Sequence, residues 1–430
     1  MLPVFLAFLF LFNPGIAQNL TGGGEGNPGL ITNKDSLEQW RNLRFGMFIH
    51  WGPVTLRGTE IGWSRGREVS YEDYDQLFRE FNPVLFDADE WVQTAKMSGM
   101  KYLVLVTRHH DGFSLWDTDH SEYDIMATPF KRDIVRELSD SCRKHGLMFC
   151  TYYSICDWYH PDYPHKFASG GRIIKKENPD MNSFNGFLRG QLEELVTEYQ
   201  SRVIWFDGEW EDPWTHEMGM DLYAWLRELD DTLLINNRVD KGRRGMAGVS
   251  ESDRFAGDFE TPEQEIGAFN PHTPWETCIT IGDQWAWKAN DRVKSYEECL
   301  KILLNTVGGD GNLLLNIGPM ADGRFESRQT EILLKIGKWL DKYGEAVYGT
   351  RGGPVPPRDW GVTTHKDKTL YIHLTDNGRN EVFLPGVKML SAVGMDDGKT
   401  LDFENGRFGA VLKTEGLTGK PFTVVKAEME

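Results

Sequence analysis

The chain has 430 residues, of which 40% are hydrophobic, and its formal net charge at pH 7 is −18. This length allows one large enzyme domain of roughly 250–300 residues and a smaller second domain. The acidic balance argues against a nucleic-acid partner, because such complexes need basic side chains to neutralise phosphates. Tryptophan is frequent, with 15 copies. Aromatic rings suit sugar ligands, since the C–H faces of sugars stack on them.

The segment 1–17 has the pattern of a secretion signal peptide. Its apolar run, Leu2 to Phe12, is too short to span a bilayer, and small residues precede Gln18. The usual basic residues before such a run are absent from the sequence. No further apolar stretch of about 18 residues follows, so no membrane span is expected. We expect the mature chain to begin near Gln18 and to be secreted or periplasmic.

Five cysteines are scattered through the sequence, an odd number without any CxxC pair. This usage indicates neither a disulfide scaffold nor a thiolate zinc site. We expect most of the cysteines to be buried as small hydrophobic side chains. The sequence predicts no cofactor and no metal ion.

Short apolar runs alternate with amphipathic segments from residue 44 onward. Continuous apolar strands separated by helices are typical of a parallel sheet that is covered on its faces. Two α/β architectures share this pattern, the (β/α) barrel and the doubly wound sheet. The predicted strands are 44–52, 101–110, 147–154, 203–208, 232–238, 275–282 and 312–319, and the predicted helices are 88–100, 132–146, 186–200, 222–229, 295–308 and 327–344.

Polar residues at the ends of the predicted strands distinguish between these two architectures. In a barrel the carboxyl ends of all strands share one mouth, whereas an open sheet spreads them along a line. No glycine-rich phosphate-binding fingerprint follows the first strand, which weakens the doubly wound alternative. We therefore predict a (β/α)8-like TIM barrel over residues 30–350. The strand-end residues are His50, His109, His110, Tyr153, Asp207 and Arg238.

The pattern changes after the glycine- and proline-rich linker 351–357. Short alternating apolar runs follow, separated by turn signals that include Asn-Gly and Asp-Gly pairs. We expect a small antiparallel β-sandwich over residues 356–430, packed beside the barrel. It contains few candidate catalytic groups, so we assign it a structural role.

His109 and His110 come directly after a predicted strand and before Asp111. Adjacent residues on an extended segment point to opposite faces, so both histidines cannot easily bind one metal ion. Donors and acceptors for substrate hydroxyls are the better interpretation, and histidines satisfied in the core are the alternative. No GxSxG nucleophile elbow occurs. A catalytic pair of Cys156 with a histidine stays open as a minor alternative.

Carboxylates at the predicted mouth suggest glycoside hydrolysis, which typically uses two of them on opposite sides of the scissile bond. Asp207 is the first carboxylate after its strand, and Glu209 lies two positions later, on the same face of an extended segment. A pair on one face would lie on one side of the sugar, so the second carboxylate must come from elsewhere. Glu263 lies in a loop that Pro262 stiffens and can reach the far side. The other candidates are Glu60, Glu260 and Glu276.

Several motifs together resemble the α-L-fucosidases of glycoside hydrolase family 29 and occur in family order over residues 40–350. The resemblance implies a (β/α) barrel with a C-terminal β-sandwich, and an exo-acting, retaining double displacement on terminal α-L-fucose. A fucose-binding barrel without activity and a hydrolase of a related sugar such as α-L-galactose are the alternatives. The motifs are RFGMFIHWG, RHHDGF, YYSICDWY, VIWFDG, NNR, TPE, PWETC, GGDGNLLLNIGP and the DG before the last barrel helix.

The resemblance also implies roles for individual residues. Asp207 matches the family nucleophile and Glu263 the usual acid/base, with Glu276 as its rival. The family has adjacent Glu and Trp after HWG, whereas EIGW here keeps Glu60 for a sugar hydroxyl and displaces Trp63 by two positions. The implied substrate is a fucosylated oligosaccharide or glycoconjugate, with the linkage left open. The residues that match fucose-binding positions are His50, His109, His110, Tyr153 (or Tyr152), Trp205 and Arg238.

Overall fold

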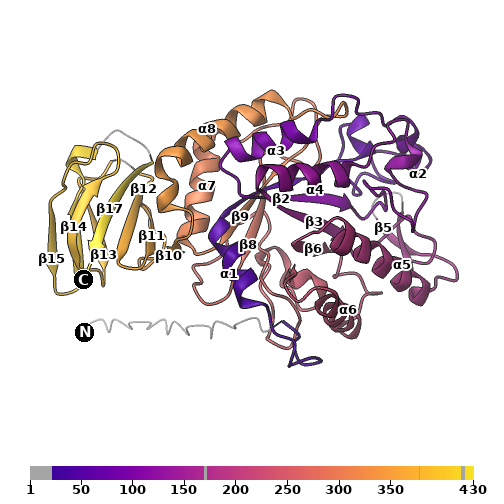
Figure 1. Cartoon of the computed structure of the whole chain (residues 1–430), viewed down its shortest axis with the longest axis horizontal. Coiled ribbons are helices and arrows are strands. Elements are labelled where there is room, and N and C mark those ends of the chain that lie inside the picture. The colour runs from indigo at the N-terminus through magenta and orange to yellow at the C-terminus, as the bar shows by residue number, and fades with distance from the viewer. Residues whose placement is uncertain (1–21, 169–171, 377, 418–421) are drawn as a thin grey trace, which may run out of the picture.

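The computed structural model describes residues 22–168, 172–376, 378–417 and 422–430, so the predicted signal peptide lies outside the described residues. Figure 1 shows a large part in which helices surround a central sheet, and a smaller all-β part next to helices α7 and α8. None of the helices in the described residues is both long enough and apolar enough to cross a membrane. All five cysteines are buried and unpaired, as predicted for most of them.

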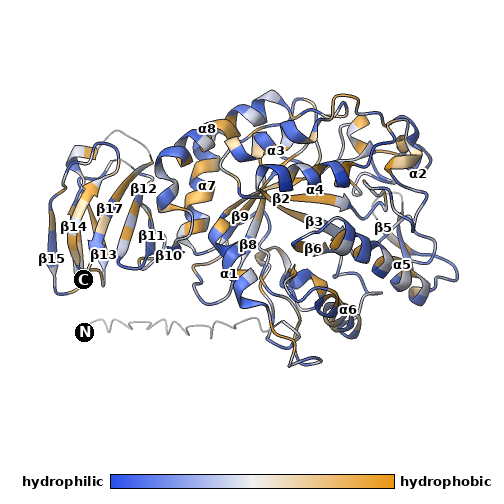
Figure 2. Ribbon diagram, viewed as in Figure 1, coloured by the Kyte–Doolittle hydropathy of each residue, from blue (hydrophilic) through white to orange (hydrophobic). Residues whose placement is uncertain are grey.

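The central sheet has seven parallel strands in the order β7-β6-β3-β2-β1-β9-β8. Every residue of β2 is buried, as expected for a strand that is covered on both faces. Figure 2 shows strands β2, β3 and β6 as predominantly hydrophobic. The strands are β1 Phe45–Ile49, β2 Tyr102–Arg108, β3 Met148–Ser154, β6 Val203–Asp207, β7 Leu234–Ile235, β8 Glu276–Thr280 and β9 Asn312–Ile317.

Helices pack on the outside of this sheet, and local signals in the sequence set their ends. Helix α4 begins after Asp133, whose side chain accepts a hydrogen bond from the Arg136 N–H, and ends at Gly146 in the left-handed conformation. Helix α1 and the short helix α2 had not been predicted. The helices are α1 Lys34–Leu43, α2 Tyr71–Tyr74, α3 Ala88–Met97, α4 Ile134–His145, α5 Met181–Glu193, α6 His216–Leu229, α7 Tyr296–Gly308 and α8 Ser327–Tyr343.

The barrel closes through an irregular segment, 258–264, that lies between β7 and β8. Parallel bridges join Asn236 to Phe259 on one side and Glu263 to Cys278 on the other. The Cys278 N–H donates to the Pro262 carbonyl over 3.1 Å, so a hydrogen bond also joins this segment to β8. Proline has no N–H to donate, so this segment cannot form a regular central strand. The predicted (β/α)8-like barrel is therefore confirmed, with one irregular position.

The C-terminal part consists of two antiparallel sheets, with orders β10-β11-β12-β17-β14 and β13-β16-β15. Side chains from both sheets share one buried cluster, which makes the predicted sandwich. The larger sheet also packs on the barrel, where Trp339 Nε1 of α8 donates to the Phe422 carbonyl over 3.0 Å. The strands are β10 Arg351–Gly352, β11 Gly361–Lys366, β12 Thr369–Leu374, β13 Glu381–Pro385, β14 Met389–Gly394, β15 Phe403–Gly406, β16 Gly409–Lys413 and β17 Thr423–Met429. A separate hairpin, β4 His165–Ala168 and β5 Arg172–Lys175, extends from the loop after β3.

Candidate active site

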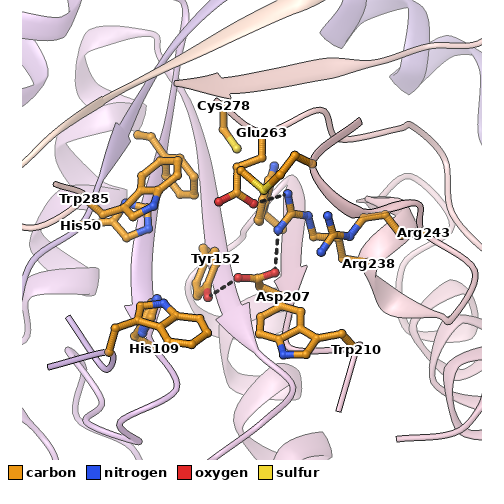
Figure 3. Close-up of a pocket in the computed structure, with 14 residues that line it drawn as sticks. His50, His109, Tyr152, Asp207, Trp210, Arg238, Arg243, Glu263, Cys278 and Trp285 are labelled. Atoms are coloured by element: carbon orange, nitrogen blue, oxygen red, sulfur yellow. Dashed lines mark hydrogen bonds and ion pairs between the residues drawn. The ribbon is translucent and has the colours of Figure 1, made fainter. Parts of the chain in front are cut away.

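A pocket of about 220 Å³ lies at the carboxyl ends of the barrel strands. Loops 241–250 and 282–287 complete its walls, and most of the lining side chains are aromatic or charged. A cavity of this size has room for one sugar ring. Figure 3 shows the labelled side chains converging on it. The lining residues are Phe48, His50, Trp63, His109, Tyr152, Trp205, Asp207, Trp210, Arg238, Arg243, Met246, Glu263, Cys278 and Trp285.

Asp207 is the last residue of β6, and two side chains hold its carboxylate. Arg238 Nη1 donates to Oδ1 over 2.6 Å, and the Tyr152 hydroxyl donates to Oδ2 over 3.2 Å. Gly208 follows in the left-handed region, at φ 97°, and a Cβ atom there would lie 2.8 Å from the Cys156 nitrogen. The chain can therefore turn away sharply after Asp207 and leave its side chain in the pocket.

Glu263 reaches the same pocket from the irregular segment, and Arg238 links it to Asp207. Arg238 Nη2 donates to Glu263 Oε2 over 2.9 Å, while Nη1 contacts Asp207 (Figure 3). The arginine is fixed in turn by Thr261, whose Oγ1 accepts from Nε over 2.9 Å. Both carboxylates predicted from the sequence thus lie on one guanidinium group at the barrel mouth.

His50 is oriented by Asn316 and offers a hydrogen-bond acceptor to the pocket. Asn316 Nδ2 donates to the Trp285 carbonyl over 2.8 Å, so its Oδ1 faces His50 Nδ1 at 2.6 Å. Nδ1 must therefore carry the proton, and Nε2 keeps its lone pair. Burial lowers the pKa of His50 to about 3, against the raising effect of the bond to Asn316. The ring is therefore neutral, and Nε2 is able to accept a hydrogen bond.

The prediction that His109 and His110 point to opposite faces is wrong, because their rings lie side by side with centroids 4.0 Å apart. Strand β2 ends at Arg108 and His110 lies in a turn, so the alternation of an extended segment does not apply to them. His109 lines the pocket and stacks on Tyr152, with ring centroids 5.6 Å apart. His110 places Nδ1 2.6 Å from Ser154 Oγ and Nε2 3.6 Å from Asp207 Oδ2. Burial lowers the pKa of both rings well below 6.5. Within the described ranges, no cluster of three histidine, cysteine or carboxylate groups could hold a metal ion.

Trp205 lies in the pocket floor, and Glu276 lies beneath it, out of reach of a substrate. Trp205 Nε1 donates to Glu276 Oε1 over 3.1 Å, and the Tyr102 hydroxyl donates to Oε2. Glu276 is the first residue of β8, at the amino end of the barrel, and does not line the pocket. The expectation that Glu276 is a rival acid or contacts the substrate is therefore wrong.

Tyr153 points out of the barrel, which corrects the predicted strand phase. Its hydroxyl donates to Gln191 Oε1 of α5 over 2.9 Å, in the layer between sheet and helices. Tyr152 is the tyrosine that lines the pocket, because successive residues of a strand face opposite sides. The alternative in which Tyr152 replaces Tyr153 is the one the structure supports.

Glu60 supports a loop and contributes no lining to the pocket. Its Oε2 accepts from the Trp285 N–H over 2.9 Å and its Oε1 from the Ala286 N–H over 3.0 Å. Glu60 is not among the lining residues, and its direct sugar contact stays a prediction. The carboxylate fixes the loop that carries Trp285, whose ring lies 4.7 Å from His50.

Trp63, displaced in the sequence, still lines the pocket. Six further lining residues carried no predicted role: Phe48 and Cys278 on barrel strands, and the loop residues Trp210, Arg243, Met246 and Trp285. Trp210 stands three positions after Asp207, and this spacing was the one available signal for it. The other three loop residues belong to segments without a regular pattern. Glu209 is buried under the rim, where its Oε1 accepts from Arg243 Nε over 2.6 Å.

Comparisons with known proteins agree with this geometry. The family model for α-L-fucosidase matches residues 30–345. Plasma α-L-fucosidase from Rattus norvegicus is 32% identical over 364 residues, covering 76% of this chain and 75% of the relative. The plasma enzyme from Homo sapiens is 31% identical over 357 residues, covering 76% and 73%.

Two solved structures extend the likeness to the three-dimensional level. α-L-Fucosidase isoenzyme 1 from Paenibacillus thiaminolyticus has a TM-score of 0.80 at 33% identity, covering 92% of this chain and 99% of that one. A covalent intermediate trapped in a family 29 fucosidase from Bacteroides thetaiotaomicron has a TM-score of 0.81 at 27% identity, covering 93% and 97%. This chain therefore belongs to the α-L-fucosidase family, glycoside hydrolase family 29.

Proposed function

We propose that the protein removes terminal α-L-fucose from oligosaccharides or glycoconjugates with retention of configuration, using Asp207 as nucleophile and Glu263 as acid/base. The observation that carries the assignment is the pair of hydrogen bonds from Arg238 to both carboxylates. The two carboxylates lie together in a pocket with room for one sugar ring. Such a pocket suits a chain end, which supports exo action.

In the first step Asp207 attacks the anomeric carbon and forms a bond between that carbon and its carboxylate oxygen. The bond to the leaving oxygen breaks, and Glu263 donates its proton to that oxygen. Retaining enzymes place the two carboxyl groups about 5–5.5 Å apart. Attachment of both groups to one guanidinium supports a short separation of this kind.

In the second step water enters the space of the departed group. Glu263, now ionised, removes a proton from the water, whose oxygen attacks the anomeric carbon from the face opposite Asp207. The ester bond breaks, Asp207 recovers its negative charge, and fucose leaves as the α-anomer. Each half-reaction returns Glu263 to the state that the next one needs.

Neutral histidines suit the recognition of an uncharged sugar. His50 accepts from one hydroxyl through Nε2, because Asn316 holds the proton on Nδ1. His109 Nδ1 has no partner among the described residues, although it is buried. That atom faces Gly62, where an added Cβ atom would lie 2.6 Å away, so a contact of His109 with a sugar hydroxyl must be made through Nε2.

Covalent labelling tests the nucleophile. A 2-fluoro-fucosyl fluoride should form a long-lived ester, because the fluorine slows hydrolysis of the intermediate. Peptide mapping by mass spectrometry should find the label on Asp207. A label on another residue, or product NMR that shows β-L-fucose first, would overturn the assignment.

Azide rescue tests the acid/base. With an aryl α-L-fucoside, azide should restore turnover in Glu263→Ala and yield α-L-fucosyl azide, since azide needs no general base. Glu276→Ala offers a matched control, because that carboxyl lies beneath Trp205 and away from the pocket. Rescue of Glu276→Ala in place of Glu263→Ala would contradict the proposal. Aryl α-L-galactoside assayed beside the fucoside tests the choice of sugar.

We also propose that segment 1–17 directs secretion. The support is the length of its apolar run and the small residues before Gln18. N-terminal sequencing of the mature protein from the periplasm or medium should begin near Gln18. Recovery of the uncleaved chain in the cytoplasm alone would refute this.

A further inference from the structure

The outer rim of the sugar pocket exposes two large apolar side chains. Trp210 is 38% exposed and Met246 is 47% exposed. The inner lining residues Tyr152 and Trp205 are, by contrast, 1% and 2% exposed. Exposed apolar groups that continue a binding pocket mark a surface that a ligand covers.

Trp210 is held in a defined orientation before any ligand arrives. Its ring stands at 87° to the His110 ring, with centroids 5.3 Å apart, and lies nearly parallel to Trp63, at 15° and 6.3 Å. Trp63 is itself supported by an edge contact with Trp158 at 5.2 Å. A preset aromatic surface loses little conformational entropy on binding.

The neighbouring part of the rim is the loop 241–250, which is tied to the proposed acid. The Glu263 N–H donates to the Met246 carbonyl over 2.8 Å, and the Thr261 N–H donates to the Gly248 carbonyl over 3.3 Å. Glu263 protonates the leaving oxygen, so the group attached to that oxygen must lie beside this loop. Arg243 and Met246 are the loop residues that line the pocket there.

Charges at this rim favour a neutral ligand. Arg243 Nε donates to Glu209 Oε1 over 2.6 Å and Nη1 to the Gly245 carbonyl over 2.5 Å. Its Nη2 has no hydrogen-bond partner in the part of the chain that the structure describes. The arginine can therefore donate to an oxygen, but Glu209 already balances its charge. When substrate binds, Asp207 is ionised, Glu263 is protonated and Arg238 is cationic, so these three groups leave no net positive charge to attract an anion. The chain as a whole has a net charge of −18, which disfavours an anionic ligand.

We propose that Trp210, Met246 and Arg243 form a leaving-group subsite for a neutral pyranose. The sugar rests its C–H face on the Trp210 ring, and Arg243 Nη2 donates to one of its oxygens. The inference rests on the proposed function and names the class of group from which fucose is removed. It predicts fucose bonded to neutral hexoses or N-acetylhexosamines as substrates, and not fucose bonded to uronic acids or sulfated sugars.

Two substrates that share the fucosyl group distinguish a loss of leaving-group binding from a loss of catalysis at the fucosyl group. α-L-Fucosyl fluoride has no leaving-group ring, whereas a fucosyl disaccharide with a neutral hexopyranose places one on Trp210. In Trp210→Ala we expect kcat/KM for the disaccharide to fall at least tenfold more than kcat/KM for the fluoride. Trp210→Phe should recover most of this difference. Phe408→Ala removes an aromatic residue that is 74% exposed on the C-terminal sandwich and serves as the matched control.

A partition experiment gives a readout that does not depend on how much variant folds. With fucosyl fluoride as donor, the covalent intermediate reacts either with water or with an added methyl hexopyranoside. In transfer, the bond from fucose to Asp207 breaks, the bond to the acceptor oxygen forms, and Glu263 takes the acceptor proton. The ratio of transfer to hydrolysis should fall about tenfold in Trp210→Ala. Methyl glucuronide should be a poorer acceptor than methyl glucoside in the wild type, most clearly at low salt.

Equal losses on fluoride and disaccharide, an unchanged transfer ratio, or equal use of glucuronide and glucoside would overturn the subsite. Failure of the wild type to hydrolyse fucosyl fluoride would instead overturn the proposed function. The two failures are therefore distinguishable in one set of assays.

Discussion

Arg238 Nη1 donates a hydrogen bond of 2.6 Å to Asp207 Oδ1 from a fully buried position. The other terminal nitrogen of the same arginine contacts Glu263, and its guanidinium carbon lies 4.4 Å from the centre of the Trp205 ring. Burial lowers the pKa of Arg238, but attraction to Asp207 and Glu263 outweighs this effect and raises the pKa well above its ordinary value. One permanent cation thus sets the relative positions of both proposed catalytic carboxylates.

Arg238→Lys should lose most of the activity although it keeps the charge. A single ammonium group cannot make the separate, fixed contacts that the planar guanidinium makes with both carboxylates. We expect kcat/KM for an aryl fucoside to fall by roughly 10²–10³-fold, the cost typical of losing one preorganised donor. Circular dichroism of the variant checks that the fold persists. Activity within threefold of the wild type would show that the paired contacts of Arg238 with both carboxylates are not needed for catalysis.

The neighbours Tyr152 and Tyr153 provide a matched pair of variants. Tyr152→Phe removes the hydroxyl that donates to Asp207, so kcat should fall by roughly 10–100-fold, as for a hydrogen bond to a charged group. Tyr153→Phe removes the bond to Gln191 and should lower the free energy of unfolding by about 1 kcal/mol. Its kcat should stay close to the wild-type value. The reverse pattern in kinetics and denaturant titrations would contradict the strand phase seen here.

Glu276→Gln should reveal a pH-dependent cost of burying a carboxyl group. Burial raises the pKa of Glu276 to about 8 from 4.5, with opposing hydrogen bonds from Tyr102 and Trp205. Between pH 4.5 and pH 8 the carboxyl group of Glu276 is ionised in the unfolded chain but stays protonated in the folded chain. The free energy of unfolding therefore has its full value below pH 4.5 and decreases as the pH rises to 8. The slope is at most about 1.4 kcal/mol per pH unit.

The measurement for Glu276 is the melting temperature of both proteins from pH 5 to pH 9. The stability of Glu276→Gln relative to the wild type should increase with pH up to about 8 and then level off. A constant difference would contradict the raised pKa. Glu276→Leu, which removes the acceptor for Trp205 Nε1, should reduce kcat more than Glu276→Gln does.

His50 should take part in binding without titrating near neutral pH. Because burial lowers its pKa to about 3, the ring stays neutral throughout the range from pH 5 to pH 8. His50→Phe should lower kcat/KM by roughly 10–100-fold through the lost hydroxyl contact. The shape of the pH–rate profile between pH 5 and 8 should be the same in both proteins. A limb near pH 6.5 that disappears in the variant would show that His50 ionises in the active range.

Regular barrel strands could be predicted because their side chains are buried on both faces. The apolar run 101–110 became β2, Tyr102–Arg108, and the run 312–319 became β9, Asn312–Ile317. The closing segment 258–264 gave no such signal, since it contains polar residues and Pro262. Its extended course depends on bridges to Asn236 and Cys278, which lie on separate elements.

Within the site, position along a strand was predictable and orientation was not. Asp207 follows an apolar run, so its place at the mouth could be inferred directly from the sequence. The phase of β3 could not, because Tyr152 and Tyr153 are both aromatic and both buried. Glu276 shares its residue type with Glu263, but it starts a strand at the opposite end of the barrel.

By itself, the sequence determined the order of strands and helices, the positions of Asp207 and Glu263 in the chain, and the family through its motifs. These features depend on local patterns of burial and on side-chain chemistry. Only the tertiary structure decided that Arg238 joins the two carboxylates, that Tyr152 faces the pocket, and that Glu60 and Glu276 support the pocket from outside it. Those relationships depend on contacts between segments far apart in the chain, and such contacts form only when the barrel closes.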